Sequence, residues 1–468
     1  MYINNPATYT DYYELTMAQG YYKSGLHNKT AVFDYFFRAL PFNGGYVVYA
    51  GLNELLETLE TFQFQQEELE YLEREGFDTE FINFLKGFRF TGNLFSAREG
   101  EIIFPKEPVL RVEGNLVETQ IIETLILNIL NFQSLIATKA SRLRFAAGSR
   151  KVLDFGLRRS QGLGGVHATR AALIGGLDGT SNVYAAHKYN LPASGTMAHS
   201  WVQSFDDELT SFRTFARHFP DHSILLVDTY NTLESGVPNA IKVAKELESN
   251  GHRLKGIRLD SGDLAYFAKQ SRKMLDEEGL GYVKIAASNQ LDEHIIKSLI
   301  TQNAPIDVFG VGTRLVTGQD SPALDGVYKL AEINGKPTLK ISENIEKITF
   351  PGRKKVYRYL NEDGSFNGDA IVMEDEDEID RMIHPYFPAK RSTMKHMKFE
   401  LLLHPVICDG ELCLELPGVM DIADYCKQRL QKLNREHQRF DNPHIYKVGI
   451  SNKLFELRDE MITKIKDE

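Results

Sequence analysis

The chain has 468 residues, enough for two to four domains, and its 42% apolar and 25% charged residues are typical of a globular protein. It carries 54 Lys and Arg residues against 64 Asp and Glu residues, and the net charge of −10 disfavours general binding to nucleic acid or anionic membranes. Three cysteines are too few for a disulfide framework, which favours a reducing cytoplasm. The first residues, MYINNPATYTDYYE, show no secretory signal pattern.

The first 135 residues predict a mixed α+β domain. Apolar residues at helical spacing predict a helix from Thr10 to about Lys23. Further elements are expected in chain order, namely strands at 31–38 and 46–50, helices near 52–59 and 66–75, and short strands at 102–104 and 109–112. The apolar segment 117–135 is interrupted by Glu123, Asn128 and Asn131, so we expect a buried helix there and not a membrane span.

A repeating pattern begins at residue 151. Short apolar runs lie at 151–157, 192–198, 223–229, 254–260, 282–288 and 306–312, with helix-like segments such as 239–248, 263–277 and 292–300 between them. A strand–helix unit recurring at this spacing is typical of parallel βα crossovers. Because no Gly-x-Gly-x-x-Gly motif opens the region, the pattern favours a parallel α/β barrel over an open dinucleotide-binding sheet.

The ends of these predicted strands are polar or small. The residues at these ends are Asp154, Thr196, Asp228, Asp260, Ser288 and Gly312. Any one of them could simply cap the following helix. Parallel barrels carry their chemistry on the loops at the carboxyl ends of strands, and six such ends together favour a polar pocket at one mouth.

The chain after about residue 321 returns to short strands. Asn334-Gly335 predicts a hairpin turn, the acidic run 374–378 predicts a solvated loop, and the last 50 or so residues look helical. We therefore expect three parts: an N-terminal α+β domain over 1–135, the barrel with the active site over 136–320, and C-terminal strands and helices over 321–468 that pack on the other two.

Two residues near these strand ends are candidates for chemistry. His199, in GTMAHSW, is either a structural residue or an acid, base, metal ligand or phosphate acceptor. Arg258 lies inside an apolar strand, where a guanidinium needs an anion. Its partner is either Asp260 or Asp228 in a salt bridge, or an anionic substrate that the planar Arg fork would recognise.

Two further motifs carry weaker signals. The loop FGVGTR at 309–314 offers glycines and a hydroxyl where barrels frequently bind phosphate, while no nucleotide P-loop is present. The residues His404, Cys408, Cys413 and Cys426 have a spacing conceivable for zinc. Because Cys413 alternates with leucines in a strand-like run, unconnected thiols are the preferred interpretation.

These motifs resemble those of the nicotinate phosphoribosyltransferase family. The matching segments are TDYYELTM at 10–17, DFGLRR at 154–159, GTMAHS at 195–200, DTY at 228–230, RLDSGD at 258–263 and GVGT at 310–313. The resemblance implies an incomplete, TIM-like α/β barrel with an N-terminal α+β domain and a small C-terminal α+β region. It also implies a homodimer whose active sites lie at the subunit interface.

The resemblance implies an ATP-dependent, ligase-type reaction with Mg²⁺. Nicotinate and phosphoribosyl pyrophosphate would give nicotinate mononucleotide and pyrophosphate, coupled to ATP hydrolysis, as the first step of NAD salvage from nicotinate. His199 would be transiently phosphorylated by ATP. The binding residues implied are Tyr13 from the neighbouring subunit, Phe155, Thr196 and Arg258 for nicotinate, and Arg158, Asp228, Asp260, Gly312 and Thr313 for ribose and phosphate.

The sequence leaves three alternatives open. Relatives that use nicotinamide keep an acidic residue near a stretch that here reads Gly179–Asn182, with Asp178 slightly earlier, which favours nicotinate over nicotinamide or quinolinate. A phosphosugar aldolase or isomerase barrel would need a lysine or paired carboxylates at strand ends, and no lysine is there. A non-catalytic binding protein is the third alternative. The ring nitrogen of a pyridine needs no general base, which explains why no Ser/His/Asp triad is evident.

Overall fold

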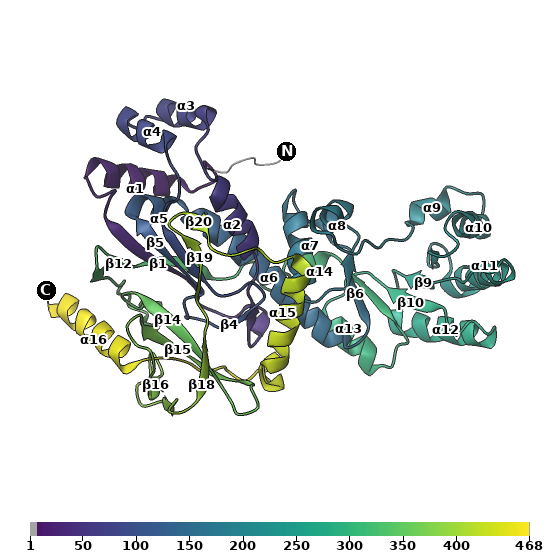
Figure 1. Ribbon diagram of the computed structural model, residues 1–468. Coiled ribbons are helices and arrows are strands. Elements are labelled where there is room, and N and C mark those ends of the chain that lie inside the picture. The colour runs from purple at the N-terminus through teal and green to yellow at the C-terminus, as the bar shows by residue number, and fades with distance from the viewer. Residues whose placement is uncertain (1–6, 468) are drawn as a thin grey trace. The chain divides into compact units, whose positions relative to one another are not determined.

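The computed structural model describes residues 7–467 and divides into two compact units (Figure 1). Unit 1 combines the chain up to Thr138 with the chain from Ala323 onward, and unit 2 comprises Lys139–Pro322. Both units mix helices and strands, so the expected α/β class holds, with a parallel sheet in unit 2. The division into domains at 1–135, 136–320 and 321–468 stays a prediction.

Unit 1 is built around a sheet to which both ends of the chain contribute. Its order is β13-β12-β1-β5-β3-β19-β20. The strands are β1 (Thr30–Phe37), β3 (Asn93–Ser96), β5 (Leu110–Asn115), β12 (Gly326–Ile333), β13 (Lys336–Pro337), β19 (His404–Cys408) and β20 (Glu411–Leu412). In the antiparallel pair β1 and β12, the rings of Phe33 and Tyr328 stack 4.6 Å apart. The early and late segments therefore share one hydrophobic core.

The remaining strands of unit 1 form two smaller sheets. A pair joins β2 (Val47–Val48) to β4 (Ile102–Ile103). The other of these two sheets has six strands. They are β14 (Lys354–Leu360), β15 (Phe366–Met373), β16 (Arg381–Ile383), β17 (Arg391–Thr393), β18 (Lys398–Leu401) and β21 (Val448–Ile450). At the predicted hairpin turn, Asn334 and Gly335 have φ values of 50° and 75°, as a two-residue turn between β12 and β13 requires.

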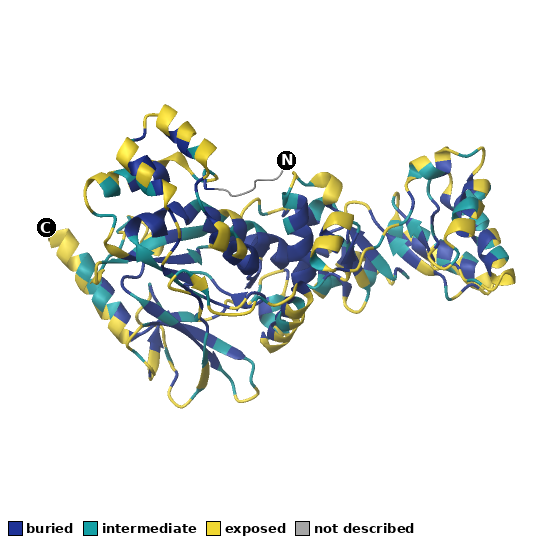
Figure 2. Ribbon diagram, turned by 45° about the horizontal axis from the view of Figure 1, so that its top comes forward, coloured by how far each residue is buried: buried dark blue, intermediate teal, exposed yellow. Residues whose placement is uncertain are grey.

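The helices of unit 1 confirm most of the sequence predictions. They are α1 (Tyr12–Lys23), α2 (Leu52–Thr61), α3 (Gln66–Arg74), α4 (Thr79–Lys86), α5 (Leu116–Ile121), α6 (Glu123–Ala147), α15 (Val419–Lys432) and α16 (Asn452–Asp467). The helix expected at 117–135 is divided at Ile122 and extends further. By length and composition the stretch 116–147 could cross a membrane, but 67% of its most apolar window is buried (Figure 2). It is the buried helix that we expected.

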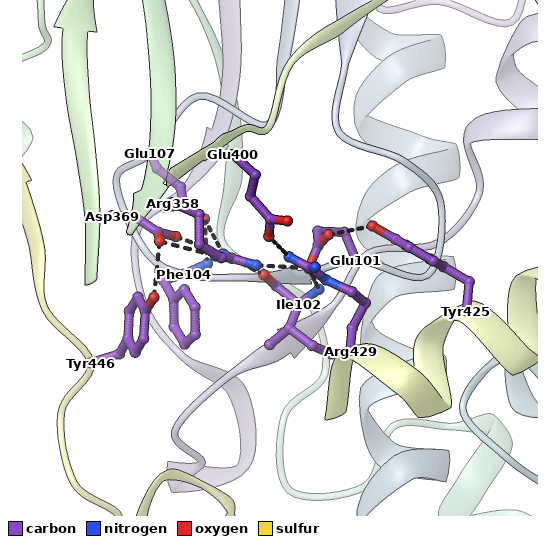
Figure 3. Close-up of polar contacts among 10 residues, drawn as sticks. All are labelled: Glu101, Ile102, Phe104, Glu107, Arg358, Asp369, Glu400, Tyr425, Arg429 and Tyr446. Carbon is purple, nitrogen blue, oxygen red and sulfur yellow. Dashed lines mark hydrogen bonds and ion pairs between the residues drawn. The ribbon is translucent and has the colours of Figure 1, made fainter. Parts of the chain in front are cut away.

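A network of buried charges joins residues of the early and late segments within unit 1 (Figure 3). The guanidinium of Arg358 is fully buried and donates to Asp369 at 3.0 and 2.6 Å and to Glu101 at 2.7 Å. Arg429 donates to Glu101 at 2.8 Å. Burial alone would raise the pKa of Glu101, but the two arginines hold it below its usual value. Every nitrogen of Arg358 thus has a partner inside the protein.

The cysteines correct one expectation. Cys408 and Cys413 form a disulfide, with their Cα atoms 5.9 Å apart, while Cys426 is a buried free thiol. The pairing follows from the β19–β20 hairpin, in which Cys408 lies opposite Glu411 and the amide of Cys413 bonds to Val406. Unconnected thiols are therefore wrong for this pair, and two of the four zinc-ligand candidates are engaged with each other.

Unit 2 is built on a six-stranded parallel sheet of order β7-β6-β11-β10-β9-β8. The strands are β6 (Lys151–Asp154), β7 (Gly179–Thr180), β8 (Ile224–Leu226), β9 (Gly256–Leu259), β10 (Lys284–Ala287) and β11 (Val308–Val311). The helices are α7 (Gly164–Ile174), α8 (Val183–Tyr189), α9 (His199–Gln203), α10 (Glu208–His218), α11 (Val237–Ser249), α12 (Leu264–Glu277), α13 (Glu293–Thr301) and α14 (Thr313–Val316).

One predicted strand of this unit is wrong. The run 192–198 is not a strand and contributes only a parallel bridge between Ala193 and Thr180. Its proline and glycine and its lack of β-branched residues other than Thr196 make it a poor strand. The strand beside β6 is instead the two-residue β7, which is too short to leave a pattern in the sequence.

Candidate active site

The carboxyl ends of the parallel strands surround a cavity of about 430 Å³ in unit 2. The cavity is lined by residues that follow β6, β9, β10 and β11 and by the loop before α9. Seven predicted site residues line it: Phe155, Arg158, Thr196, Arg258, Asp260, Gly312 and Thr313. The structure therefore brings segments more than 150 residues apart in the sequence to one polar pocket.

Asp154 holds the first turn of this pocket in place. Its buried carboxyl accepts hydrogen bonds from the amide of Gly156 at 2.8 Å and from the hydroxyls of Thr169 and Thr180 at 2.7 and 2.8 Å. Burial raises the pKa of Asp154, and these three bonds oppose that rise. Because all of its contacts lie within the protein, Asp154 fixes the turn that presents the next residue, Phe155.

The Phe155 ring rests against the backbone of β11. A Cβ atom at Gly310 would lie only 2.4 Å from Cε2 of that ring, so glycine is needed for the ring to take this position. The ring consequently forms one wall of the cavity beside the Gly312–Thr313 turn. A flat aromatic wall next to a backbone turn suits a planar ligand that carries a phosphate group.

Arg258 has unused hydrogen-bonding capacity at the cavity. It lies in β9 between Leu226 and Ala286 of the neighbouring strands, and its Nη1 donates to the hydroxyl of Thr196 at 2.5 Å. Its buried Nε has no hydrogen-bond partner among the described residues. Burial lowers the pKa of Arg258, while the charges of Asp260 and Asp228 oppose that change. The guanidinium is thus oriented by Thr196 and open to an anion.

The salt bridge that we considered for Arg258 does not form. Asp228 instead accepts from the amide of Asp260 at 2.7 Å and the hydroxyl of Ser261 at 2.8 Å, both through Oδ2. Its buried Oδ1 lacks a partner within the described part of the chain. Asp260 accepts a short hydrogen bond from Ser288. Arg258 and Asp228 thus each keep an unpaired polar atom within the described part of the chain, but only Arg258 lines the cavity.

His199 begins α9 close to this carboxylate pair. Its Nδ1 lies 3.1 Å from the hydroxyl of Thr229, and its Nε2 lies 3.8 Å from Oδ2 of Asp260. The side chain is 40% exposed. One ring nitrogen is thus engaged by a hydroxyl, while the other faces Asp260 and solvent. This arrangement suits reversible modification of the imidazole better than a purely structural role.

Three cavity residues are not among the predicted site residues. Ser181, Asn289 and Gln290 also line the pocket. Asn289 and Gln290 have φ values of 86° and 50°, an uncommon conformation for residues other than glycine. Their signal in the sequence is a polar pair directly after a predicted strand.

Tyr13 belongs to the other compact unit. It lies in the first turn of α1 and is 46% exposed. Residues 7–467 contain no group of three or more His, Cys, Asp or Glu side chains arranged to hold a metal ion.

Comparison with known families matches most of the chain to one family. The nicotinate phosphoribosyltransferase (NAPRTase) N-terminal domain matches residues 8–131, the NAPRTase family model matches 150–382, and the C-terminal domain matches 353–458. The chain belongs to the nicotinate phosphoribosyltransferase family. The resemblance inferred from six short segments is thereby confirmed.

Relatives of this family match nearly end to end. The nicotinate phosphoribosyltransferase of Bacillus subtilis is 47% identical over 98% of this chain and 95% of its own length. That of Dictyostelium discoideum is 39% identical over 96% of this chain and 86% of its own length. The crystal structure of human nicotinic acid phosphoribosyltransferase covers 97% of this chain and 99% of its own, with 30% identity and a TM-score of 0.87.

Proposed function

We propose that the protein joins nicotinate to phosphoribosyl pyrophosphate, giving nicotinate mononucleotide and pyrophosphate, and couples this step to ATP hydrolysis. The observation that carries the proposal is the open Arg258 guanidinium, oriented by Thr196 in a cavity walled by Phe155. A half-buried cation beside an aromatic wall matches an aromatic carboxylate. Membership in the family supports the same substrates.

The protein contributes to this reaction mainly by positioning the substrates and by stabilising the charges that develop on them. The ring nitrogen of nicotinate attacks C1 of the ribose, the bond to pyrophosphate breaks, and positive charge develops on the sugar as negative charge leaves with pyrophosphate. No proton has to be removed from the nucleophile. Fixed charges and a fixed geometry at the reacting atoms are therefore the main sources of rate.

The proposed residue roles are those that the family resemblance implies. Phe155 and Tyr13 of the partner subunit sandwich the pyridine ring, and Thr196 with Arg258 binds its carboxylate. The residues proposed to hold ribose and phosphate are Arg158, Asp228, Asp260, Gly312 and Thr313, all of which except Asp228 line the cavity.

Magnesium is the cation that we propose for this site. Mg²⁺ prefers one or two carboxylates together with substrate phosphates and water. The unpartnered Oδ1 of Asp228 and the adjacent Asp260 fit that requirement. The ion would neutralise charge on the departing pyrophosphate, while the protein residues hold the ribose in line with the ring nitrogen.

His199 is the residue that we propose to couple ATP hydrolysis to synthesis. The γ-phosphoryl group of ATP is transferred to the imidazole, a P–N bond forms as ADP leaves, and water later releases inorganic phosphate. Nε2 is the favoured acceptor because Nδ1 is engaged by Thr229. The phosphoryl group adds about −1.5 to −2 charges next to Asp260, which would rearrange the pocket between the two half-reactions. Because no separate ATP motif exists, ATP and phosphoribosyl pyrophosphate share the cavity.

The sheet of unit 2 supports an incomplete barrel. Its first strand, β6, pairs with both β7 and the last strand, β11, which is the pairing that closure of a barrel produces. After β7 only the bridge at Ala193 continues the sheet, and β8 begins at Ile224. We propose that the barrel stays open between these two points.

We further propose a homodimer with shared active sites, a cytoplasmic location and a role in NAD salvage from nicotinate. The exposed side chains of Tyr12, Tyr13 and Met17 on α1 support the dimer, because exposed aromatic and apolar side chains gathered on one helix favour a protein interface.

The deciding experiment incubates the protein with nicotinate, phosphoribosyl pyrophosphate, Mg²⁺ and ATP labelled at the γ-phosphate. We expect nicotinate mononucleotide by chromatography, and acid-labile label on the peptide that contains His199. Parallel reactions with nicotinamide and quinolinate test the substrate assignment. Formation of product from either of them in preference to nicotinate would reject it, and label on a peptide lacking His199 would reject the phosphohistidine.

A further inference from the structure

Helix α1 places an exposed tyrosine directly before a fully buried carboxyl group. Tyr13 is 46% exposed, whereas the next residue, Glu14, is 0% exposed. The amide of Glu14 donates to the carbonyl of Asp11 at 3.0 Å, so both residues belong to the first turn of the helix. Whatever holds Glu14 therefore also fixes the backbone from which the Tyr13 ring projects.

Both oxygens of Glu14 are held by threonine hydroxyls. Thr124 of α6 donates to Oε1 at 2.6 Å, and Thr10 donates to Oε2 through a short hydrogen bond. The Thr124 hydroxyl also accepts from the amide of Asp11 at 3.2 Å. These bonds fasten the first turn of α1 to the start of α6. Among the residues that make these bonds, Glu14 is the one next to Tyr13 in the sequence.

The surroundings of Glu14 are mainly acidic. The charges of Glu123 and Asp11 act on the Glu14 carboxyl group, and Lys329 of β12 lies 3.9 Å from Glu123. The other titratable groups that sense these carboxyls are the phenols of Tyr13, Tyr21 and Tyr328. Burial, with smaller contributions from Glu123 and Asp11, raises the pKa of Glu14 to about 7 despite the two threonine bonds. Its charge therefore changes near neutral pH.

We propose that Glu14 is a positioning residue for nicotinate, holding Tyr13 in place and weakening nicotinate binding when its carboxyl group is ionised. The inference rests on the proposed function, since Tyr13 must contact the pyridine ring of the nicotinate that is bound in the partner subunit. Nicotinate is an anion, and the ionised Glu14 adds to the negative charges of Asp11 and Glu123, which also act on the Tyr13 phenol. Screening by water and salt keeps the repulsion modest, so we expect about a threefold effect on the KM for nicotinate.

The test is a pH profile of the KM values in the wild type and in Glu14→Gln. The amide keeps the shape and the acceptor oxygen of the carboxyl group but cannot ionise. In the wild type the KM for nicotinate should rise about threefold from pH 6 to pH 8, with a midpoint near 7. In Glu14→Gln it should stay at its low-pH value. The KM for phosphoribosyl pyrophosphate should be the same in both proteins at each pH.

A matched control comes from the same unit. Glu118 is also a buried carboxylate that accepts a hydrogen bond from a threonine hydroxyl, that of Thr91, but it lies in a separate hydrogen-bond cluster with Asn115. Glu118→Gln should leave the pH profile of the wild type unchanged. A rise in the nicotinate KM that persists in Glu14→Gln, or disappears in Glu118→Gln, would overturn the proposal.

A second measurement separates this proposal from the proposed function. With tyrosine labelled at ¹³Cζ, the Tyr13 resonance, assigned through Tyr13→Phe, should shift with pH around 7 in the wild type and not in Glu14→Gln. If the wild type makes no nicotinate mononucleotide but the resonance still shifts, the proposed function fails while the coupling of Glu14 to Tyr13 stands. If the resonance shows no shift that depends on Glu14, the positioning role is refuted even in an active enzyme.

Discussion

The buried charges of unit 1 and the charges of the cavity in unit 2 use the same residue types with opposite results. In unit 1 Arg358 has every nitrogen paired with Asp369, Glu101 or the carbonyl of Ile102. In unit 2 Arg258 has one hydrogen bond to a threonine, and its Nε is unpaired. A saturated cluster, in which the hydrogen-bonding groups of the arginine are all paired, holds segments of the chain together. An unsaturated cluster, in which some of these groups are unpaired, has capacity for a ligand. This contrast is one reason to regard the cavity as the candidate functional site.

The largest expected effect is on stability, at the saturated cluster. Arg358→Met should lower the free energy of unfolding by about 3–5 kcal/mol, because Asp369 and Glu101 would stay buried without their partner. Urea denaturation followed by circular dichroism measures this loss. The KM for nicotinate should not change, because it does not depend on how much of the protein is folded.

Arg258→Met should show the reverse pattern. Loss of a charge-assisted contact to a carboxylate costs about 2–3 kcal/mol, which corresponds to a KM for nicotinate raised roughly 30- to 150-fold. The urea midpoint should stay close to that of the wild type, because the guanidinium is only partly satisfied in the folded protein. A large loss of stability with an unchanged KM would place Arg258 with the structural charges and undo the comparison.

Gly310→Ala should give an intermediate result. The added methyl group collides with the Phe155 ring, and overpacking of this kind costs about 1–3 kcal/mol. Because the ring has to move, the KM for nicotinate should rise together with the loss of stability. The control is Gly281→Ala, where the nearest atom to the added Cβ lies 3.5 Å away, and it should leave the KM unchanged.

The smallest expected effect is the contribution of Glu107, at the edge of the saturated cluster, to the pH dependence of the free energy of unfolding. Burial and the neighbouring charge of Asp369 raise the pKa of Glu107 well above its ordinary value. The folded protein therefore holds this proton more tightly than the unfolded chain, so stability decreases as the pH rises above about 4.5 toward the folded-state pKa. Glu107→Gln should flatten this part of the curve of unfolding free energy against pH. An unchanged slope would show that Glu107 is ionised in the folded protein.

The sequence predicted the cavity better than it predicted the charge network. Strand ends can be found from local patterns, and in a parallel sheet all of them meet at one edge, so Asp260 and Thr313 could be placed together. No local pattern pairs Arg358 with Glu101, which lie 257 positions apart. Such a contact depends on tertiary packing that one sequence does not reveal.

The errors have similar physical causes. The run 192–198 was mistaken for a strand because its polar end fitted the repeat, although Pro192 and Gly195 disfavour strand structure. The disulfide between Cys408 and Cys413 depends on a hairpin register that the alternating leucines concealed. In each case a periodic pattern was extended across residues that interrupt it.

The central sheet of unit 1 also sets an order for biosynthesis. Ala31 of β1 pairs with Ile333 of β12, so a ribosome must add about 300 residues before the first long strand meets this neighbour. At ~5–20 residues per second, that interval lasts roughly 15–60 s. The entire chain of unit 2 is made within it, while the nascent N-terminal segment still exposes apolar surface. Newly made chains should therefore depend on chaperone protection until translation of the last third is complete.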